Sequence, residues 1–506
     1  MDPSREDAVW RQAQERLSDH ACTSIFNVPV LPPAAALEKA QNSLRPHLPT
    51  EGLGLEDTVN HLFDDVVPGF NGSSLTPNYY GFVTGGVTAA AGVADRLVST
   101  YDQNVQVHLP HETISTVVED RALVLLLELL DLKSEEWPGR TFTTGATASN
   151  VLGLACGREH AVAKATARRG EAISIAEDGL IEVMLRSGLR RVQILTTAPH
   201  SSLRKAASVV GLGRASVKDV GNGRHGLKFD FGRLESALSD PQSASIVVIS
   251  CGEVNTGLFA TTCYEEFKHI RDLCDEYGAW LHVDGAFGLF GRLLRPSTPF
   301  AAIHQCCAGM ELADSLTGDA HKFLNVPYDC GFFLTRHASA LPTTFQNPSA
   351  AYLATSSASA IPSPLNTGIE NSRRFRALPV YATLLSYGIS GYRSLLETQI
   401  TLARKIADFV LGHAGFELLA SPAPDTHRED VLADVYIIVL FRAKDEGLNN
   451  ELVARINGSK KIYVSGTKWE GRPAARIAVS HCGVEVSRDF EIVKGVLEGV
   501  VTGWKE

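Results

Sequence analysis

Short apolar runs alternate with helical patterns along residues 140–335 of the chain. Apolar runs bounded by turn residues predict strands, and apolar positions at helical spacing predict the helices between them. We predict strands at 192–195, 245–250, 279–283 and 331–334, and helices over 149–168, 201–210 and 264–277. This alternation is typical of an α/β fold whose mostly parallel sheet is covered on both faces. In such sheets ligands bind beyond the carboxyl ends of the strands, so functional residues are expected there.

The pattern changes on either side of this region. Residues 1 to about 75 predict an arm of short helices interrupted by prolines, and helices follow at 87–102 and 112–131. Residues 336–372 show little periodicity, which is typical of a functional or mobile loop. A long helical pattern then runs from 373 to about 413, broken near Gly388 and Gly391, before strands at 433–441 and 475–480 and a helix from about 487. We therefore predict an N-terminal arm (1–84), a large domain (85–375) and a small C-terminal α+β domain (376–506).

Composition narrows the class of protein. The 506 residues are 44% hydrophobic and 21% charged, as in ordinary soluble globular proteins. The net charge of −10 is spread without long charged blocks, which argues against nucleic acid or an anionic membrane as a partner. The nine cysteines include no C-x-x-C pair, which favours reduced thiols in a cytoplasmic protein and argues against a zinc site. The apolar run at 122–130 is too short to cross a bilayer, and the N-terminus lacks a signal pattern.

One lysine has unusual neighbours. Lys322 follows His321 and precedes Phe323 within the stretch GDAHKFLN, residues 318–325. An apolar strand is predicted shortly afterwards, so the charge of Lys322 should lie where it is costly to bury. A lysine in such surroundings can act as a nucleophile and form a Schiff base. The alternative is a lysine at a strand end whose amino group reaches solvent.

Other candidate chemistry lies at predicted helix and strand ends. The turn TTGATASN (143–150) leads into a helix, and its small residues let backbone N–H groups approach a phosphate; the alternative is a plain N-cap. His200 follows an apolar strand, where it is either a ligand-binding or a structural residue. Asp284 follows another strand, where a carboxylate is expensive to bury without a cationic partner. The segment PNYYGFVTGG (77–86) is consistent with either a ligand cavity or a packed turn.

These features form an ordered set along the chain. A phosphate cradle, a histidine, an acid and a lysine are the groups that pyridoxal 5′-phosphate (PLP) chemistry requires. The cradle holds the phosphate, the acid keeps the pyridine nitrogen protonated, a flat residue stacks on the ring and the lysine forms the aldimine. We therefore predict an enzyme with PLP as its cofactor.

The motifs also carry a family resemblance. Over roughly residues 75–490 the chain resembles the group II PLP-dependent amino-acid decarboxylases, the family of aromatic-L-amino-acid and glutamate decarboxylases. The segments that carry the resemblance are HVDGAFG (282–288), ADSLTGDAHKF (313–323), YDCGFF (328–333), SRRFR (372–376) and ARIAVS (475–480). The resemblance implies the type I aminotransferase-like fold and a homodimer whose active site lies between the subunits.

The resemblance implies roles for individual residues. Lys322 is expected to form the aldimine, Asp284 to pair with the pyridinium nitrogen and His200 to stack on the ring. Further cofactor contacts are expected from Thr84, Ala146, Thr147, Asn255, Ala286, Ser315 and His321. Substrate contacts are expected from Arg476, which matches an arginine that holds the α-carboxylate in some members, and from Tyr80 and Phe82, which line the pocket of either their own chain or the partner chain.

The chain departs from the family pattern around the cofactor. Ala146 stands where many relatives have serine. Val254 stands where a threonine often contacts the cofactor, so Asn255 or Thr256 is expected to take over that contact. The arginines of the SRRFR segment fit either a substrate-carboxylate site or the anchoring of a helix start by ion pairs.

The larger departure lies in the loop before Arg373. Family decarboxylases carry a tyrosine there that protonates the carbanion after CO₂ leaves, and the matching position falls at about Pro364. Tyr352 aligns with an earlier, different tyrosine. Relatives without the tyrosine divert the quinonoid to oxygen and yield aldehyde, and another residue such as His200 is an alternative proton donor.

The leading hypothesis is decarboxylation of a small-molecule L-amino acid through an external aldimine and a quinonoid. The first alternative is PLP-dependent decarboxylative oxidative deamination, or lyase or condensation chemistry with the same cofactor, because the loop tyrosine is missing. The second is a binding or scaffold module, which is disfavoured because such a protein does not need the cofactor residues that this chain retains. No metal is expected.

Overall fold

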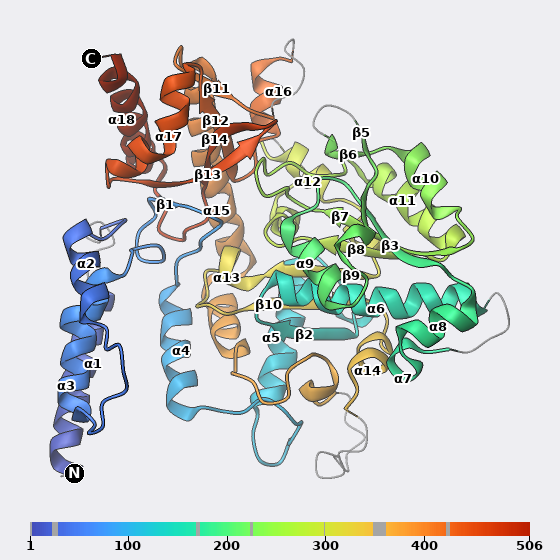
Figure 1. The fold of residues 1–506 in the computed structure, drawn as a ribbon, viewed down its shortest axis with the longest axis horizontal. Coiled ribbons are helices and arrows are strands. Elements are labelled where there is room, and N and C mark those ends of the chain that lie inside the picture. Colours follow the sequence, from blue (N-terminus) through green and yellow to red (C-terminus); the bar gives the residue numbers. More distant parts are fainter. Residues whose placement is uncertain are drawn as a thin grey trace.

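The computed structural model describes residues 3–22, 29–167, 173–222, 226–297, 299–347, 361–420 and 426–505. At its centre lies a seven-stranded sheet with the strand order β2-β10-β9-β8-β7-β3-β4 (Figure 1). Its strands are β2 (Gly139–Thr143), β3 (Arg191–Thr196), β4 (Val217–Asp219), β7 (Ser243–Ser250), β8 (Trp280–Asp284), β9 (Ser315–Asp319) and β10 (Gly331–Thr335). Neighbours from β4 to β9 pair in parallel, and β10 is antiparallel to both β9 and β2. The predicted mixed, mostly parallel sheet is confirmed.

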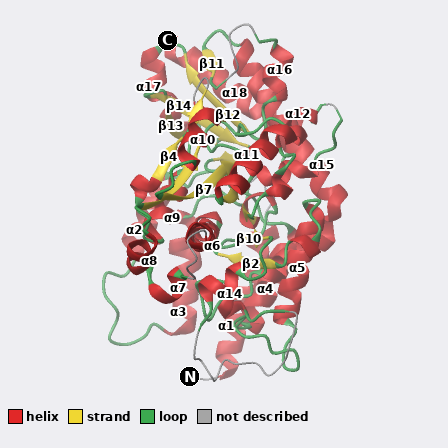
Figure 2. Ribbon diagram, turned by 90° about the vertical axis from the view of Figure 1, so that its right-hand side faces the viewer, coloured by secondary structure: helices red, strands yellow, loops and turns green. Residues whose placement is uncertain are grey.

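Helices cover both faces of this sheet (Figures 1 and 2). They are α4 (Ala89–Tyr101), α5 (Ser115–Leu129), α6 (Ala146–Ala167), α7 (Ile175–Asp178), α8 (Leu180–Ser187), α9 (Ser201–Val209), α10 (Phe231–Leu238), α11 (Tyr264–Tyr277), α12 (Ala301–Cys306), α13 (Ala320–Phe323) and α14 (Ala340–Phe345). A short hairpin of β5 (Gly221–Asn222) and β6 (Lys228–Phe229) follows β4. Helix α6 crosses β7, β8, β9 and β10, and it begins three residues before the predicted 149, so the phosphate-cradle turn forms its first turn.

Alternate residues of a strand point to opposite faces of the sheet. On β8, Leu281 and Val283 belong to the core cluster on the face away from α6, whereas Trp280 packs in the cluster that contains α6 residues. The same alternation turns His282 and Asp284 toward α6. Polar side chains of β8 therefore lie beneath one helix, and Asp284 lies at the carboxyl end of the strand.

The C-terminal part of the chain forms a second sheet with the order β1-β13-β14-β12-β11. Its elements are α15 (Ala377–Gly412), β11 (Phe416–Leu418), α16 (Arg428–Ala433), β12 (Ile438–Ala443), α17 (Glu446–Gly458), β13 (Tyr463–Trp469), β14 (Arg472–Ala478) and α18 (Val486–Lys505). Gly388 interrupts α15 with φ of 57°, at a predicted break. The strand predicted from 433 begins only at Ile438, because α16 extends to Ala433.

The N-terminal segment forms an arm and one strand. The arm consists of α1 (Pro3–Cys22), α2 (Ala34–Ser43), α3 (Gly54–His61) and two short helical turns, Leu62–Val66 and Val67–Gly69, and lies at the left of Figure 1. Strand β1 (Tyr79–Tyr80) pairs in parallel with β13, so this segment joins the C-terminal sheet. Within the described ranges, none of the helices has the length and apolar character needed to cross a membrane.

Candidate active site

A cavity of about 290 Å³ lies beyond the carboxyl ends of β7, β8 and β9. Segments distant in sequence meet there: the first turn of α6, the start of α9, the loops after β7 and β8, and α13. Its lining residues are Thr144, Gly145, Ala146, Thr147, Ala148, His200, Ser202, Ser250, Gly252, Val254, Asp284, Ala286, Phe287, Asp319, His321 and Lys322. The sheet therefore brings together Lys322, Asp284 and His200, which were predicted from separate motifs.

Lys322 lies in α13, the single helical turn that follows β9. Its Nζ forms an ion pair with Asp319 Oδ2 at 2.8 Å and lies 5.8 Å from the centre of the Phe287 ring. The Asp319 side chain is only 4% exposed and that of Lys322 is 21% exposed, so the amino group faces the cavity from a largely buried position. Sequence reasoning missed Asp319, although its spacing of three residues from a lysine at the start of a helix is a signal for such a pair.

Asp284 ends β8 and reaches the cavity from the α6 face. Asn150 of α6 donates from Nδ2 to Asp284 Oδ2 at 2.8 Å. Asp284 is buried, and a buried carboxylate is stabilised by donors of this kind. Asn150 is a second residue that sequence reasoning missed, because its partner is 134 positions away.

His200 forms the N-cap of α9. Its Nδ1 accepts a hydrogen bond from the Ser202 backbone N–H at 3.2 Å, and Ser202 Oγ lies 2.6 Å from the same nitrogen. Because Nδ1 acts as an acceptor, the ring is neutral and carries its hydrogen on Nε2. Burial lowers the pKa of His200, with Asp284 opposing this effect, and so favours the neutral form.

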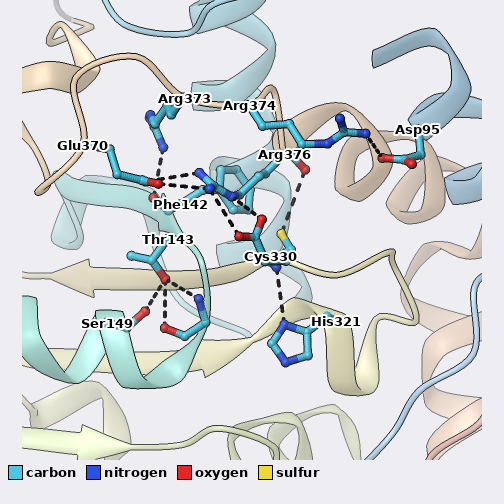
Figure 3. Close-up of polar contacts among 12 residues, drawn as sticks. Asp95, Phe142, Thr143, Ser149, His321, Cys330, Glu370, Arg373, Arg374 and Arg376 are labelled. Carbon is cyan, nitrogen blue, oxygen red and sulfur yellow. Dashed lines mark hydrogen bonds and ion pairs between the residues drawn. The ribbon is translucent and has the colours of Figure 1, made fainter. Parts of the chain in front are cut away.

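The predicted phosphate cradle is the junction between β2 and α6, shown in Figure 3. Thr143 Oγ1 lies 2.7 Å from Ser149 Oγ and accepts from the Gly145 N–H, which ties the turn to the helix. A Cβ added to Gly331 of the neighbouring strand would lie 2.5 Å from the Gly145 Cα, so the backbones meet closely here. The first N–H groups of a helix have no partner within it, which makes this end suited to an anion.

An acidic side chain already occupies part of this cradle. Asp319 Oδ1 accepts from the Ala146 N–H at 2.5 Å, while Oδ2 pairs with Lys322. Thr147 and Ala148 also line the cavity at the start of the helix. Asp319 thus links the lysine to the anion-binding end of α6.

His321 lines the cavity beside Lys322. Its Nδ1 accepts from the Cys330 N–H at 3.3 Å, as Figure 3 shows, and its ring contacts the Tyr328 ring at a centroid distance of 4.5 Å. Burial lowers the pKa of His321, although Asp319 opposes the effect. The ring is therefore held against β10 and is predominantly neutral.

Several residues that sequence analysis assigned to the cofactor lie elsewhere. Ser315 points beneath α6, where its Oγ accepts from Trp280 Nε1 at 2.9 Å. Asn255 turns its amide to Glu253 and Thr467, while Thr256 also bonds Glu253, so Val254 alone of this turn reaches the cavity. In this structure hydrogen bonds hold the side chains of Ser315 and Asn255 away from the cavity, and their contact with the cofactor stays a prediction.

The predicted contacts from the N-terminal segment also lie outside the lining. Thr84 Oγ1 donates to the Gly81 carbonyl, and Tyr80 is buried in the core of the C-terminal domain. Phe82 is exposed, with φ of 57°. Pairing of β1 with β13 explains this placement, because it carries the segment to the C-terminal sheet.

Arg476 lies behind Val254, on β14. It donates from Nε to the Val254 carbonyl and from Nη1 to the Phe82 carbonyl, both at 2.5 Å. Its Nη2 is buried and has no hydrogen-bond partner in the part of the chain that the structure describes. Burial lowers the pKa of Arg476 to about 10, which leaves the guanidinium charged at neutral pH.

The three arginines that precede α15 all form ion pairs, and Figure 3 shows those that Arg374 forms with Asp95 and Arg376 with Glu370. Arg373 pairs with Glu119, Arg374 with Asp95, and Arg376 with both Asp329 and Glu370. They anchor the start of α15, which favours the second of the two interpretations of this cluster. The predicted loop position Pro364 is buried in a short helical turn, Pro364–Asn366, and Tyr352 lies outside the described residues.

Comparisons with known proteins identify the class. A family model described as the pyridoxal-dependent decarboxylase conserved domain matches residues 40–428. The chain is 28% identical over 320 residues to L-2,4-diaminobutyrate decarboxylase of Acinetobacter baumannii, covering 62% of this chain and 58% of that protein. It is 30% identical over 278 residues to 3,4-dihydroxyphenylacetaldehyde synthase of Drosophila melanogaster, covering 53% and 49%. The crystal structure of Oryza sativa TDC with PLP and tryptamine has the same fold, with a TM-score of 0.79, 22% identity and coverage of 100% and 99%.

The chain therefore belongs to the pyridoxal-dependent decarboxylase family, whose members are PLP-dependent lyases. The predicted family, fold and cofactor are confirmed. The cavity suits PLP on its own chemistry as well: it offers an amino group at Lys322, a buried carboxylate at Asp284 and, at Thr147 and Ala148, the N-terminal turn of a helix. Asp319 is an acidic neighbour of the anion site, and its ion pair with Lys322 balances its charge.

Proposed function

We propose that the protein removes the α-carboxylate of an L-amino acid as CO₂ in the cavity around Lys322. The observation that carries this proposal is the convergence of Lys322, Asp284 and His200 on one cavity at the N-terminus of α6. Bound PLP supplies an electron sink for the charge that remains when CO₂ departs. The other contributions come from the chain's own side chains.

Six of the lining residues have proposed roles. Lys322 would hold the cofactor covalently, Asp284 would accept a hydrogen bond from its ring nitrogen, and the N–H groups of Thr147 and Ala148 would bind its phosphate. His200 and Ala286 would enclose the ring, and His200 Nε2–H would return a proton to the substrate carbon. Donors and charges held in a site that excludes water act more strongly than they do in solution.

Arg476 is the proposed partner of the substrate carboxylate. The free Nη2 supports this role, because a buried guanidinium N–H without an acceptor is costly and a carboxylate satisfies it. The two carbonyls that bind Nε and Nη1 fix the plane of the guanidinium. The carboxylate would then be bound on the Val254 side of the cavity.

The test is a product assay with the PLP-loaded enzyme and a panel of L-amino acids. Equal amounts of CO₂ and amine from at least one amino acid are expected. The panel should include diamino and aromatic members, because relatives carry both kinds of name. Absence of CO₂ with every member of the panel would contradict the proposal.

A second candidate function is decarboxylative oxidative deamination, in which amino acid, O₂ and water give aldehyde, CO₂, ammonia and H₂O₂. The family resemblance and one comparison support it. The position matched to the protonating tyrosine falls at about Pro364, and one relative at 30% identity is named an aldehyde synthase. Peroxide and aldehyde in amounts equal to CO₂ would establish this reaction, whereas amine formation that is unchanged without O₂ would refute it.

We infer that the enzyme is a homodimer. Helix α4 exposes Val93, Leu97 and Tyr101 at a spacing of four residues, which places them on one face, and Ile114 is 71% exposed nearby in sequence. Contiguous exposed apolar surface of this kind marks an interface. Light scattering after gel filtration should give twice the chain mass, and Val93→Lys with Tyr101→Lys should reduce it; a monomer in the unmodified protein would contradict the inference.

Eight of the nine cysteines, those from Cys156 to Cys482, are free thiols, which supports a cytoplasmic location for the protein. Fractionation of the source cells tests it: recovery of the protein in an oxidising compartment would contradict it.

A further inference from the structure

A chain of hydrogen bonds leads away from Asp284 beneath α6. Asn150 donates from Nδ2 to Asp284 Oδ2 at 2.8 Å, and its Oδ1 lies 2.9 Å from His282 Nε2. His282 Nδ1 lies 2.7 Å from Ser315 Oγ, which accepts from Trp280 Nε1 at 2.9 Å. Asn150, His282, Ser315 and Trp280 are fully buried, and none of them lines the cavity.

The chemistry of the two end groups gives these bonds a direction. Asp284 accepts, so the Asn150 amide presents its N–H to the carboxylate and its oxygen to His282. His282 must therefore carry a hydrogen on Nε2. At the other end the indole of Trp280 can only donate, which leaves the Ser315 hydroxyl hydrogen for His282 Nδ1. A neutral His282 with its hydrogen on Nε2 satisfies every atom of the chain.

The surroundings of His282 keep it in this state. Burial lowers its pKa to about 4, against the opposing effect of Asp284. On the sheet, His282 is the Cα partner of Ser315 in the β8–β9 register. On the helix, Gly153 follows Asn150 by one turn, and a Cβ added there would lie 2.6 Å from His282 Cε1. Helix α6 thus lies directly on the imidazole, and the ring cannot turn without moving the helix.

We propose that Asn150, His282 and Ser315 are positioning residues that hold Asp284 for the cofactor. Through these hydrogen bonds Asn150 donates one N–H of fixed orientation to Asp284 Oδ2. The other carboxylate oxygen then remains to accept a hydrogen bond from the ring nitrogen. The carboxylate is then oriented before the cofactor arrives, so binding does not have to order it. This inference rests on the proposed function in one respect, namely that Asp284 is the partner of the ring nitrogen.

The test compares Ser315→Ala with Thr317→Val. Ser315→Ala removes the donor to His282 Nδ1 and so frees the imidazole to change its hydrogen position. Thr317 is two residues further along β9, on the same face, and its buried Oγ1 has no hydrogen-bond partner among the described residues. Thr317→Val therefore removes a hydroxyl from the same strand face without breaking the chain, and it is the matched control.

The first readout uses cofactor-free protein labelled with ¹⁵N-histidine, with the His282 signals identified by their loss in His282→Asn. At pH 7.5 the unmodified protein and Thr317→Val should show a neutral ring with its hydrogen on Nε2, and Ser315→Ala should show a mixture of tautomers. A charged ring, or a hydrogen on Nδ1, in the unmodified protein would overturn the inference. This measurement of the hydrogen position on His282 does not depend on PLP binding.

The second readout is the dissociation constant for PLP, measured by titrating cofactor-free protein. Loss of a supporting hydrogen bond typically weakens a bound group by about 10-fold or more, so Ser315→Ala should bind about 10-fold more weakly than Thr317→Val. Asn150→Asp, which replaces the donor to Asp284 with an acceptor, should bind more weakly still. Equal affinities for all three variants would overturn the inference. Failure of the unmodified protein to bind PLP would instead overturn the proposed function.

Discussion

The ion pair between Arg373 and Glu119 supports the strand that carries the phosphate cradle. Arg373 also donates to the carbonyl of Phe142 at 3.0 Å, on β2 just before the cradle, and to the carbonyl of Val105. The two charged side chains are 3% and 7% exposed, so each is almost completely removed from water. Glu119 Oε2 is buried without a partner in the described chain, which makes Arg373 the main compensation for that carboxylate.

Arg373→Met should therefore be strongly destabilising. Removing one member of a buried pair leaves an uncompensated charge and costs about 3–5 kcal/mol. The double variant Arg373→Met with Glu119→Met removes both charges, and replacing a buried pair with apolar residues is often close to neutral. Thermal unfolding of the cofactor-free protein should show a much lower midpoint for the single variant and recovery of most of the loss in the double variant.

The pH dependence supplies a sharper check on the same pair. Burial raises the pKa of Glu119, and Arg373 opposes that effect. An acid whose pKa is raised on folding lowers the stability of the folded protein when it is ionised. This loss of stability is complete at high pH and decreases as the pH falls toward the pKa of the acid in the unfolded state. The loss of stability caused by Arg373→Met, relative to the unmodified protein, should therefore be smaller at pH 5.5 than at pH 8. Additive effects of the two substitutions, or a deficit that grows as the pH falls, would refute the coupling.

Two further predictions concern the cavity. Asp319→Asn removes a negative charge at the N-terminus of α6, where a charge changes the binding free energy of an anion by about 0.3–1 kcal/mol. PLP should therefore bind about 2- to 5-fold more tightly in a titration of cofactor-free protein. Weaker binding would show that the carboxylate helps to hold the cofactor. Arg476→Met removes a charged donor worth about 1.5–3 kcal/mol, so kcat/KM should fall by about 10- to 150-fold while PLP affinity changes little. An unchanged kcat/KM would exclude Arg476 as the carboxylate partner.

The sequence predicted the architecture because hydrophobic periodicity reports local structure directly. Helix α11 has the predicted bounds, and the break in α15 falls at Gly388, where φ is positive. The observed start of α6 differs from the predicted one: the helix begins at Ala146 rather than at 149, because the small residues of the cradle continue into its first turn. The predicted strand from 433 was too long, because periodicity does not show where α16 ends.

The lining of the cavity was harder to predict than its centre. Asp284 ends β8, His200 precedes α9 and Lys322 follows β9, so their convergence follows from the topology of a parallel sheet. Asn255 and Ser315 were assigned by position in a motif, but hydrogen bonds to Thr467 and His282, which lie 212 and 33 positions away, decide where their side chains point. Asp319 and Asn150 were missed for the same reason: their contacts to Ala146 and Asp284 join segments more than a hundred residues apart.

Covalent attachment of PLP to Lys322 is the most direct test of the central claim. The unmodified protein, Lys322→Ala and Lys218→Ala should each be incubated with PLP, reduced with borohydride and digested for peptide mass spectrometry. Lys218 is a suitable control because it is another partly buried lysine, bonded to Gln193 on the far side of the sheet from Lys322 in the strand order. We predict a reduced cofactor adduct on Lys322 in the unmodified protein and in Lys218→Ala, and none in Lys322→Ala. An adduct on a different lysine, or a visible cofactor band that persists in Lys322→Ala, would contradict the assignment.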